Sequence, residues 1–195
     1  MKKKIRILFI THSLEYGGSE RVLTNLINKI NLKKFEVHVL ILKNVSKKNL
    51  NLNERDIAIH FLKSQRLRYS IFKLIKKINY INSDFIFTTS INLNLFIIIF
   101  RFLLNYKKNL VRIESMPSQH INYLPYKYLY KMGIKYLYPR SDILFVTSEA
   151  MKIDYASLAL ITKNVQILNN GVNIKYLSNF KKKFYQNNDE LNLIY

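Results

Sequence analysis

The 195-residue chain contains no cysteine and no tryptophan, and it has few glycines and prolines. The absence of cysteine excludes a disulfide framework, a cysteine zinc site and a thiol nucleophile. Four glycines and three prolines exclude collagen-like fibres and other fibres rich in these residues. Acidic residues are scarce as well, because 12 Asp and Glu stand against 32 Lys and Arg. The formal net charge is therefore +20.

Apolar residues are plentiful, at 49% of the chain, and aromatic residues make up 13%. This composition excludes an intrinsically disordered chain in spite of the charge. Area scaling allows a chain of this size to bury about 70% of its extended surface on folding. We therefore expect one large globular domain, or one domain and part of another.

The excess of positive charge makes the whole molecule attractive to anions. Nucleic acid, anionic lipid and phosphorylated substrates all fit this description. The alternative is compositional drift, because Lys, Asn, Ile and Tyr have A/T-rich codons and an A/T-rich genome makes many proteins basic. Nucleic acid is the least supported partner, since the sequence has no helix-turn-helix, RNP or KH signature.

The sequence shows neither a signal peptide nor a segment long enough to span a membrane. The apolar run Ile5–Ile10 is interrupted by Arg6 and is too short for the core of a signal peptide. The longest apolar stretch, Leu93–Leu104, falls short of the ~20 residues that a bilayer span requires. We therefore expect a cytoplasmic protein, soluble or peripheral on the inner face of the cell membrane.

Short apolar segments of the buried-strand type alternate with segments of helical periodicity along the chain. The expected strands are Ile5–Thr11, Phe35–Leu42, Ile57–Leu62, Asp84–Thr88, Leu110–Ile113, Asp142–Thr147 and Val165–Leu168. The expected helices are Glu20–Ile30, Leu67–Tyr80, Asn92–Tyr106, Tyr123–Tyr138 and Glu149–Ala159. This alternation predicts an α/β fold, a Rossmann-like parallel sheet with helices on both faces. Ligands of such sheets bind at the carboxyl ends of the strands.

A glycine pair stands where the first expected strand leads into the first helix. Gly17 and Gly18 allow a ligand to approach the backbone closely. The free N–H groups of the helix start attract anions, and Arg21 in the first turn adds a positive charge. Glu20 in the same turn is also a candidate substrate-binding residue. The alternative is a plain tight turn in which Glu20 only complements the helix dipole. The spacing does not match G-x-G-x-x-G, so a dinucleotide site is weakly supported.

The segment THSLEYGGSERV between this strand and helix resembles the opening of family 4 glycosyltransferases, which have the two-domain GT-B fold. Residues 141–149 (SDILFVTSE) resemble the family's later strand-and-turn segment. Residues 165–173 (VQILNNGVN) resemble its Asn-Gly-Val-Asp segment before the interdomain linker, with Asn173 in place of the usual Asp. These landmarks occur in the family's order and cover nearly the whole chain.

The resemblance implies transfer of a sugar, usually with retention and without a metal or other cofactor, from a nucleotide-sugar to an acceptor. It implies a hexosyltransferase that acts on a glycan or lipid-linked acceptor in bacterial surface-polysaccharide synthesis. In the family the N-terminal domain binds the acceptor, and its Gly-Gly loop lies near the donor diphosphate across the cleft. The C-terminal domain binds the nucleotide and carries a Glu-x7-Glu pattern that this sequence does not contain.

Residues 1–180 are therefore expected to form the acceptor-binding domain of one half of a GT-B fold. Residues 181–195 are expected to be a linker and, at Leu191–Tyr195, the first strand of a missing donor-binding domain. We expect the isolated chain to be inactive without that domain. The alternative is a non-catalytic subunit that recruits the acceptor for a separate donor-domain chain.

The fifth expected strand ends in a charged pair. Glu114 is the candidate catalytic residue, because it can orient an acceptor hydroxyl, and Arg112 can pair with it. The alternative is a surface Arg–Glu pair of little energetic weight. The resemblance places Ser115 where relatives carry a His, which puts acceptor chemistry inferred from those relatives in doubt.

The histidines and one asparagine complete the candidates. His12, at a strand end beside the glycine pair, is the best histidine for a substrate contact, whereas His38 and His60 lie within strands and suit structural roles. His120 has no predicted place, and no histidine pair has metal-ligand spacing. Asn170 belongs to a turn with Gly171 or, by the resemblance, to a hinge facing the cleft.

Tyrosines and lysines interleave along Tyr123–Tyr138. Such a segment suits an anionic membrane surface, where Tyr lies at headgroup level and Lys meets anionic lipid. It also suits stacking on single-stranded nucleic acid, or an amphipathic helix that covers the sheet. A lipid-linked acceptor would favour the membrane.

Overall fold

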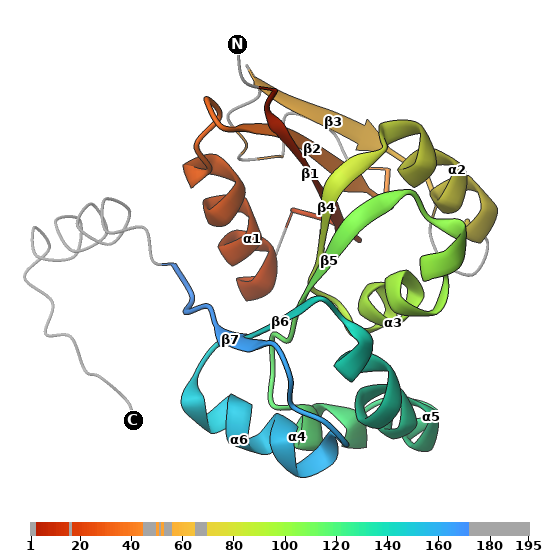
Figure 1. The fold of residues 1–195 in the computed structure, drawn as a ribbon, viewed down its shortest axis with the longest axis vertical. Helices are drawn as coiled ribbons and strands as arrows, with labels where there is room; N and C mark the ends of the chain where they lie inside the picture. The colour runs from red at the N-terminus through yellow and green to blue at the C-terminus, as the bar shows by residue number, and fades with distance from the viewer. Residues whose placement is uncertain are drawn as a thin grey trace, which may run out of the picture.

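A parallel β-sheet forms the centre of the fold (Figure 1). The computed structural model describes residues 3–15, 17–44, 50, 52, 56–64 and 70–171, and within them seven strands pair in the order β3-β2-β1-β4-β5-β6-β7. This topology confirms the Rossmann-like sheet that the alternating sequence pattern predicts. The strands are β1 Ile5–Thr11, β2 Phe35–Ile41, β3 Ile57–Phe61, β4 Ser83–Thr88, β5 Tyr106–Arg112, β6 Ile143–Val146 and β7 Val165–Ile167.

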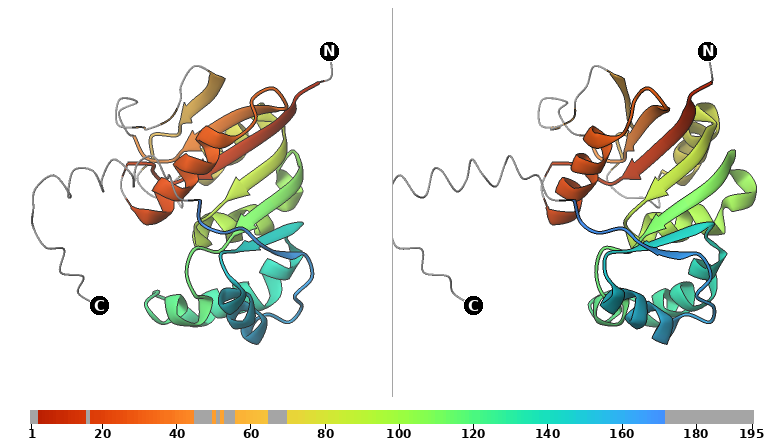
Figure 2. Two further views of the ribbon diagram at one scale, coloured as in Figure 1. Left: turned by 90° about the vertical axis from the view of Figure 1, so that its left-hand side faces the viewer. Right: turned by 60° about the vertical axis from the view of Figure 1, so that its left-hand side comes forward.

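Helices cover both faces of the sheet, as predicted (Figures 1 and 2). One face carries α1 Gly18–Lys29, whose buried side chains Leu23 and Ile27 pack on β1 and β2. The other face carries α2 Ile71–Ile81 and α3 Ile91–Ile99. Three more helices complete this second layer near β5 and β6: α4 Pro117–Asn122, α5 Lys127–Met132 and α6 Glu149–Leu158.

The central strands consist of branched and aromatic apolar residues because both of their faces are covered. In β1, Leu8 and Ile10 face α2 and α3, whereas Phe9 faces α1. β2 alternates in the same way, with Leu40 on the α2 side and Val39 on the α1 side. This alternation fixes which side chains remain available at the strand ends.

Two predicted elements around β5 are wrong in extent. The expected helix Asn92–Tyr106 ends at Ile99, because a 3₁₀ turn, η4 (Arg101–Leu103), follows and Tyr106 opens β5. The expected short strand Leu110–Ile113 therefore begins four residues earlier. The strand start was missed because residues 107–109 are polar, and Asn109 is nevertheless buried in the sheet.

Cross-strand hydrogen bonds satisfy the polar groups of this buried Asn109. Its backbone N–H donates to Asp142 Oδ2 at 2.7 Å, and its Oδ1 accepts from the Asp142 N–H at 2.6 Å. A polar residue at this position therefore supports the β5–β6 pairing, although the residue type argues against a strand.

The expected helix Tyr123–Tyr138 is also broken. It begins at Lys127, because Tyr126 has a left-handed conformation with φ 61°. A π turn, η5 (Gly133–Leu137), and a 3₁₀ turn, η6 (Tyr138–Arg140), then continue it. At Gly133 a Cβ would come within 2.8 Å of the Leu95 side chain, so glycine permits close packing on α3.

The remaining predicted boundaries agree with the structure within two residues, apart from the start of the helix predicted at Leu67, which lies outside the described residues. The predicted domain boundary at residue 180 and the predicted strand Leu191–Tyr195 also lie outside them. Among the described residues, no helix is both long and apolar enough to cross a bilayer.

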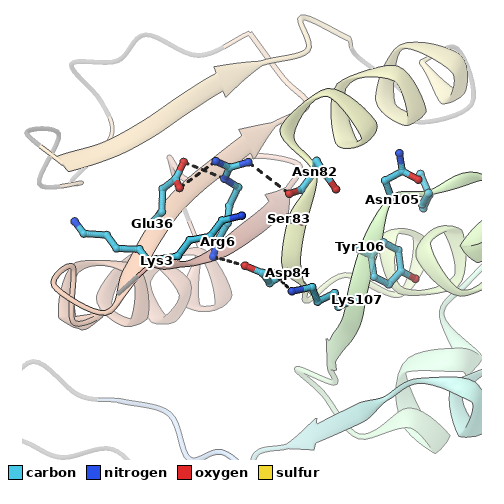
Figure 3. Close-up of a pocket in the computed structure, with 11 residues that line it drawn as sticks. Lys3, Arg6, Glu36, Asn82, Ser83, Asp84, Asn105, Tyr106 and Lys107 are labelled. Atoms are coloured by element: carbon cyan, nitrogen blue, oxygen red, sulfur yellow. Dashed lines mark hydrogen bonds and ion pairs between the residues drawn. The ribbon is translucent and has the colours of Figure 1, made fainter. Parts of the chain in front are cut away.

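Charged side chains pair with one another at the amino ends of the strands, around a cavity of about 400 Å³ (Figure 3). Arg6 makes two hydrogen bonds to the Glu36 carboxylate, at 3.0 and 3.1 Å, and Arg6 Nη1 donates to the Ile81 carbonyl at 2.8 Å. Asp84 accepts the Arg6 N–H at 2.8 Å and pairs with Lys107 Nζ at 2.6 Å. These contacts show that the charged side chains at this edge stabilise the packing of β1, β2, β4 and β5 with one another and with the end of α2.

The same network extends to two histidines on β2 and β3. His38 Nε2 lies 2.9 Å from Glu36 Oε1, and His38 Nδ1 lies 3.0 Å from His60 Nε2. The two rings stack with centroids 5.3 Å apart. These contacts agree with the structural roles expected for both residues. Burial, with the nearby charges of Lys77 and His38, lowers the pKa of His60 to about 4.

We expect the free energy of unfolding to fall as the pH is lowered from 6.5 to 4. The folded-state pKa of His60 lies below its ordinary 6.5, so the unfolded chain takes up the proton first. The full shift corresponds to about 3 kcal/mol, and we expect about half of it because the ring is partly solvated. Urea denaturation across this pH range should show a flatter profile for His60→Gln. The control is His120→Gln, because His120 is exposed. If His60→Gln kept the same pH profile as the unmodified protein and this control, His60 would not be the source of the pH dependence.

Candidate functional site

The carboxyl ends of β1, β4 and β5 meet at one edge of the sheet and border a cavity of about 250 Å³. Strand-end reasoning predicted His12, Glu114 and Ser115 for this place, and the structure brings all three to it. It also brings His120, which the sequence left unplaced, from α4. The polar or ionisable residues that line the cavity are His12, Thr89, Ser90, Asn92, Asn94, Glu114, Ser115, His120 and Tyr138.

Glu114 is the carboxylate of this cavity. Its side chain is 24% exposed, and its Oε1 is buried without a hydrogen-bond partner among the described residues. Burial raises the pKa of Glu114, while Thr89, Arg112 and Ser19 act in the opposite direction. A buried oxygen without a partner is costly, so a ligand hydroxyl that donates to it gains a favourable bond.

Two further residues that line the cavity have a buried polar atom without a hydrogen-bond partner among the described residues, Asn94 Oδ1 and Ser90 Oγ. Asn94 lies fully buried in α3, and its Nδ2 donates to the Arg112 carbonyl at 3.0 Å and to the Tyr138 hydroxyl at 3.3 Å. These two hydrogen bonds hold the Asn94 side chain in an orientation that leaves its Oδ1 without a hydrogen-bond donor among the described residues. Together with Glu114, the cavity presents hydrogen-bonding atoms that suit a ligand with several hydroxyl groups.

Sequence reasoning did not identify Asn94 and Ser90 as site residues. Asn94 is one of two asparagines, with Asn92, in the otherwise apolar helix segment INLNLFIII, and these two polar residues are the signal that would have marked it. Ser90 precedes α3 but makes no side-chain capping bond there, a fact that only the structure provides.

Arg112 is almost fully buried beside the cavity. Its Nη1 lies 3.7 Å from Glu114 Oε1, which agrees with the predicted pair, and its Nη2 donates to Asn170 Oδ1. Burial lowers the pKa of Arg112, and the Glu114 charge raises it. Arg112 and Asn170 thus join β5 to the chain after β7. Arg112 borders a separate groove along α1 and does not line the Glu114 cavity.

The glycine pair forms the start of α1, and there Glu20 complements the helix dipole. Gly17 has φ 128°, and a Cβ on it would lie 2.1 Å from Glu20 Oε2. Ser19 Oγ donates to the same carboxylate oxygen at 2.9 Å. The protein's own carboxylate thus lies where an anion was predicted to bind, so a phosphate at this helix start must displace it. Arg21 in this first turn is exposed.

Electrostatics connect this helix start to the cavity. The Glu20 charge raises the pKa of both His12 and Glu114. Burial nevertheless lowers the pKa of His12 below its ordinary 6.5, and the charge of Lys43 lowers it further. A neutral His12 ring at neutral pH can donate or accept one hydrogen bond from a ligand.

We expect alanine at the two glycines to have different effects. Gly17→Ala should lower the free energy of unfolding by about 1–2 kcal/mol, because side chains disfavour positive φ and the Glu20 carboxylate must move. Gly18→Ala should leave stability unchanged or slightly raised, since its Cβ would meet open space. Urea denaturation of both variants tests this, and an equal loss in the two would contradict the geometry.

The described residues contain no group of three or more His, Asp or Glu side chains that could hold a metal ion.

A doubly wound parallel sheet with a polar cavity at its carboxyl edge, beside a glycine-rich helix start, is the architecture of one half of a GT-B glycosyltransferase. The sequence model of Glycosyltransferase Family 4 matches residues 16–176. The chain belongs to this family.

Solved GT-B structures share the fold. HepE from Anabaena, in complex with UDP and glucose, matches with a TM-score of 0.70 and 15% identity over 95% of this chain and 51% of HepE. Sucrose-phosphate synthase from Thermosynechococcus elongatus matches with a TM-score of 0.73 and 11% identity over 93% of this chain and 53% of the synthase. The lipopolysaccharide outer core galactosyltransferase WaaB, in its apo form, gives a TM-score of 0.61 and 13% identity over 87% of this chain and 47% of WaaB.

The chain spans about half the length of these solved structures. No curated protein sequence matches it significantly. The fold and the family are therefore established by the family match and by the shared architecture.

Proposed function

We propose that this chain is the acceptor-binding domain of a retaining hexosyltransferase. The observation that carries the proposal is the cavity at the carboxyl edge, whose lining residues Glu114, Asn94 and Ser90 each have a buried polar atom without a hydrogen-bond partner among the described residues. Sugar hydroxyls both donate and accept hydrogen bonds, and they match this mixture. Membership of Glycosyltransferase Family 4 supports the reaction type.

In the proposed reaction, the bond between the donor's anomeric carbon and its phosphate oxygen breaks. A new bond forms from that carbon to an acceptor oxygen, and the proton of the acceptor hydroxyl passes to the phosphate oxygen of the leaving nucleoside diphosphate. Glu114 Oε1 accepts a hydrogen bond from this hydroxyl and orients it, and His12 and Ser115 contact the sugar beside it. The N–H groups near Gly17 and Gly18, with Arg21, attract the diphosphate after Glu20 has moved. Arg112 and Asn170 hold the wall of the site.

The donor is proposed to be a nucleotide-sugar bound by a second domain across the cleft, without a metal. HepE is a relative by fold whose structure contains UDP-glucose, which supports this class of donor. We further propose a glycan or lipid-linked acceptor of bacterial surface-polysaccharide synthesis, at the inner face of the cell membrane. The fold shared with a lipopolysaccharide galactosyltransferase supports this acceptor class.

A transfer assay tests the proposal. Radiolabelled UDP-glucose and UDP-galactose are incubated with bacterial lipid extract and with the chain, either alone or joined to a donor-binding domain of the same family. We expect label in the lipid fraction only with the joined protein. Robust transfer by the chain alone would contradict the need for a second domain. Failure of every joined protein with every donor would contradict the enzymatic role and favour a subunit that recruits acceptors.

A further inference from the structure

Large apolar and aromatic side chains are exposed along the helical layer of α2, α3 and α5. Phe72 and Tyr80 of α2 are 87% and 79% exposed, Phe102 after α3 is 80% exposed, and Leu129 of α5 is 67% exposed. The three helices lie one beyond another on the same side of the sheet (Figure 1). Isolated exposed apolar residues are ordinary, but a run of them across neighbouring helices marks an interaction surface.

An apolar groove lies within this layer, between α3 and α5. Its volume is about 510 Å³, and no charged side chain lines it. Leu95 and Ile99 of α3 form one wall, and Leu129, Met132 and Tyr136 form the other. We call this groove, together with Lys127, Lys131 and Lys135 of the same segment, the docking face.

Lysines accompany the groove-lining residues along α5 and η5, and carboxylates are absent from these elements. Lys127, Lys131 and Lys135 recur every four residues, so they form one stripe on this segment. Lysines also lie over tyrosine rings, with Lys127 Nζ 5.3 Å from the Tyr128 centroid and Lys135 Nζ 5.2 Å from the Tyr136 centroid. Residues 57–83, 85–113 and 115–141 contain no Asp or Glu, so α2, α3, α4 and α5 carry none.

We propose that the docking face binds an anionic lipid bilayer. Leu129, Met132 and the groove side chains would enter the boundary between headgroups and acyl chains, tyrosines would lie at headgroup level, and lysines would meet lipid phosphates. A second copy of this chain is a poorer occupant, because it would bring the same lysine stripe against this one. An apolar surface bordered by one sign of charge is complementary to anionic lipid.

This docking rests on the proposed function for its purpose, since it would bring a lipid-linked acceptor to the site. The connection is structural. Ile134 lines the Glu114 cavity, while its neighbours Gly133 and Leu137 line the groove. One turn of helix therefore separates the groove from the cavity. A chain docked through the groove holds the cavity within reach of a sugar attached to a lipid headgroup.

Vesicle sedimentation of the purified chain tests the proposal. We expect binding to vesicles of phosphatidylcholine mixed with phosphatidylglycerol, and little binding to phosphatidylcholine alone. The variant Lys127→Gln/Lys131→Gln/Lys135→Gln should bind about 100-fold more weakly, because each lysine near an anionic surface contributes roughly fivefold. The matched control Lys29→Gln/Lys33→Gln/Lys34→Gln removes the same charge from the α1 side and should change binding far less. Equal losses in the two variants would overturn the proposal.

The absence of tryptophan from the chain allows a second readout that does not depend on charge. Met132→Trp should show a blue-shifted emission with the anionic vesicles, whereas Lys33→Trp on the loop after α1 should not. An unshifted Met132→Trp spectrum would overturn the proposal, as would a dimer in solution that Leu129→Gln dissociates without any vesicle binding. Neither assay uses a sugar donor, so vesicle binding without sugar transfer would refute the proposed function and leave the docking face intact.

Discussion

Replacing Glu114 with glutamine should lower kcat/KM for sugar transfer roughly 10- to 100-fold in the chain joined to a donor-binding domain. Oε1 of Glu114 is buried at the cavity without a hydrogen-bond partner among the described residues, and its ion-pair neighbour Arg112 Nη1 lies 3.7 Å away. The acceptor hydroxyl is therefore its expected hydrogen-bond donor. A hydrogen bond to a charged group contributes about 1.5–3 kcal/mol, and each 1.4 kcal/mol is tenfold in rate. Gln keeps the shape but weakens the acceptor.

The matched control for this change is Glu149→Gln. Glu149 is exposed at the start of α6 and pairs with Lys152 at 3.5 Å, outside the cavity. The Glu149→Gln variant should transfer sugar as fast as the unmodified protein. If Glu114→Gln transferred sugar as fast as the unmodified protein, Glu114 would have no part in orienting the acceptor.

Replacing Arg112 with leucine should reduce the free energy of unfolding by about 3 kcal/mol, measured by urea denaturation. The guanidinium is buried, and its loss leaves Glu114 without its positive neighbour and releases Asn170. Breaking a buried charge pair by removing one partner costs about 3–5 kcal/mol, and the partial exposure of Glu114 places this pair at the lower end. The exposed Arg140→Leu should change stability by less than about 0.5 kcal/mol.

A double variant separates the charge pair from the loss of packing. Arg112→Leu/Glu114→Gln should be more stable than Arg112→Leu alone, because it no longer buries an unpaired carboxylate. If the two changes simply added, the 3.7 Å approach between Arg112 and Glu114 would carry no energy.

The two edges of the sheet differ in how their polar groups are satisfied. At the amino edge, Arg6, Glu36, Asp84 and Lys107 bond to one another (Figure 3). Ser83 Oγ, of a residue that lines the amino-edge cavity, is buried without a hydrogen-bond partner among the described residues. Three residues that line the carboxyl-edge cavity, Ser90, Asn94 and Glu114, each have such an atom, and one of these atoms is a carboxylate oxygen. The carboxyl edge is therefore the better candidate for binding a ligand, although the larger of the two cavities is at the amino edge.

Sequence reasoning located the strands well because parallel strands buried on both faces have a distinctive composition. Ile5–Thr11 is predicted to the residue for this reason. It failed where local composition and tertiary context disagree. The largely apolar residues 100–104, interrupted only by Arg101, concealed the end of α3, and the buried pairing of Asn109 with Asp142 concealed the start of β5.

The sequence predicted only those site residues that directly follow a strand. His12, Glu114 and Ser115 follow strands and therefore meet at the carboxyl edge. Asn94 and His120 reach the cavity from helices, and their helical positions gave no sign of the direction in which the side chains point. The glycine pair indicated an anion site, but only the structure shows that Glu20 lies over the helix start.

The most direct test of the account is an NMR titration of the ¹⁵N-labelled chain with methyl glucoside, methyl galactoside and methyl mannoside. We expect saturable shifts of amides in residues 12, 89–94 and 113–120, around the Glu114 cavity, for at least one sugar. The amino edge around Arg6 and Lys107 serves as the internal reference and should not respond. Saturable shifts at the amino edge, or no shift at the carboxyl edge with any of the sugars, would contradict the central claim that the carboxyl-edge cavity binds a sugar.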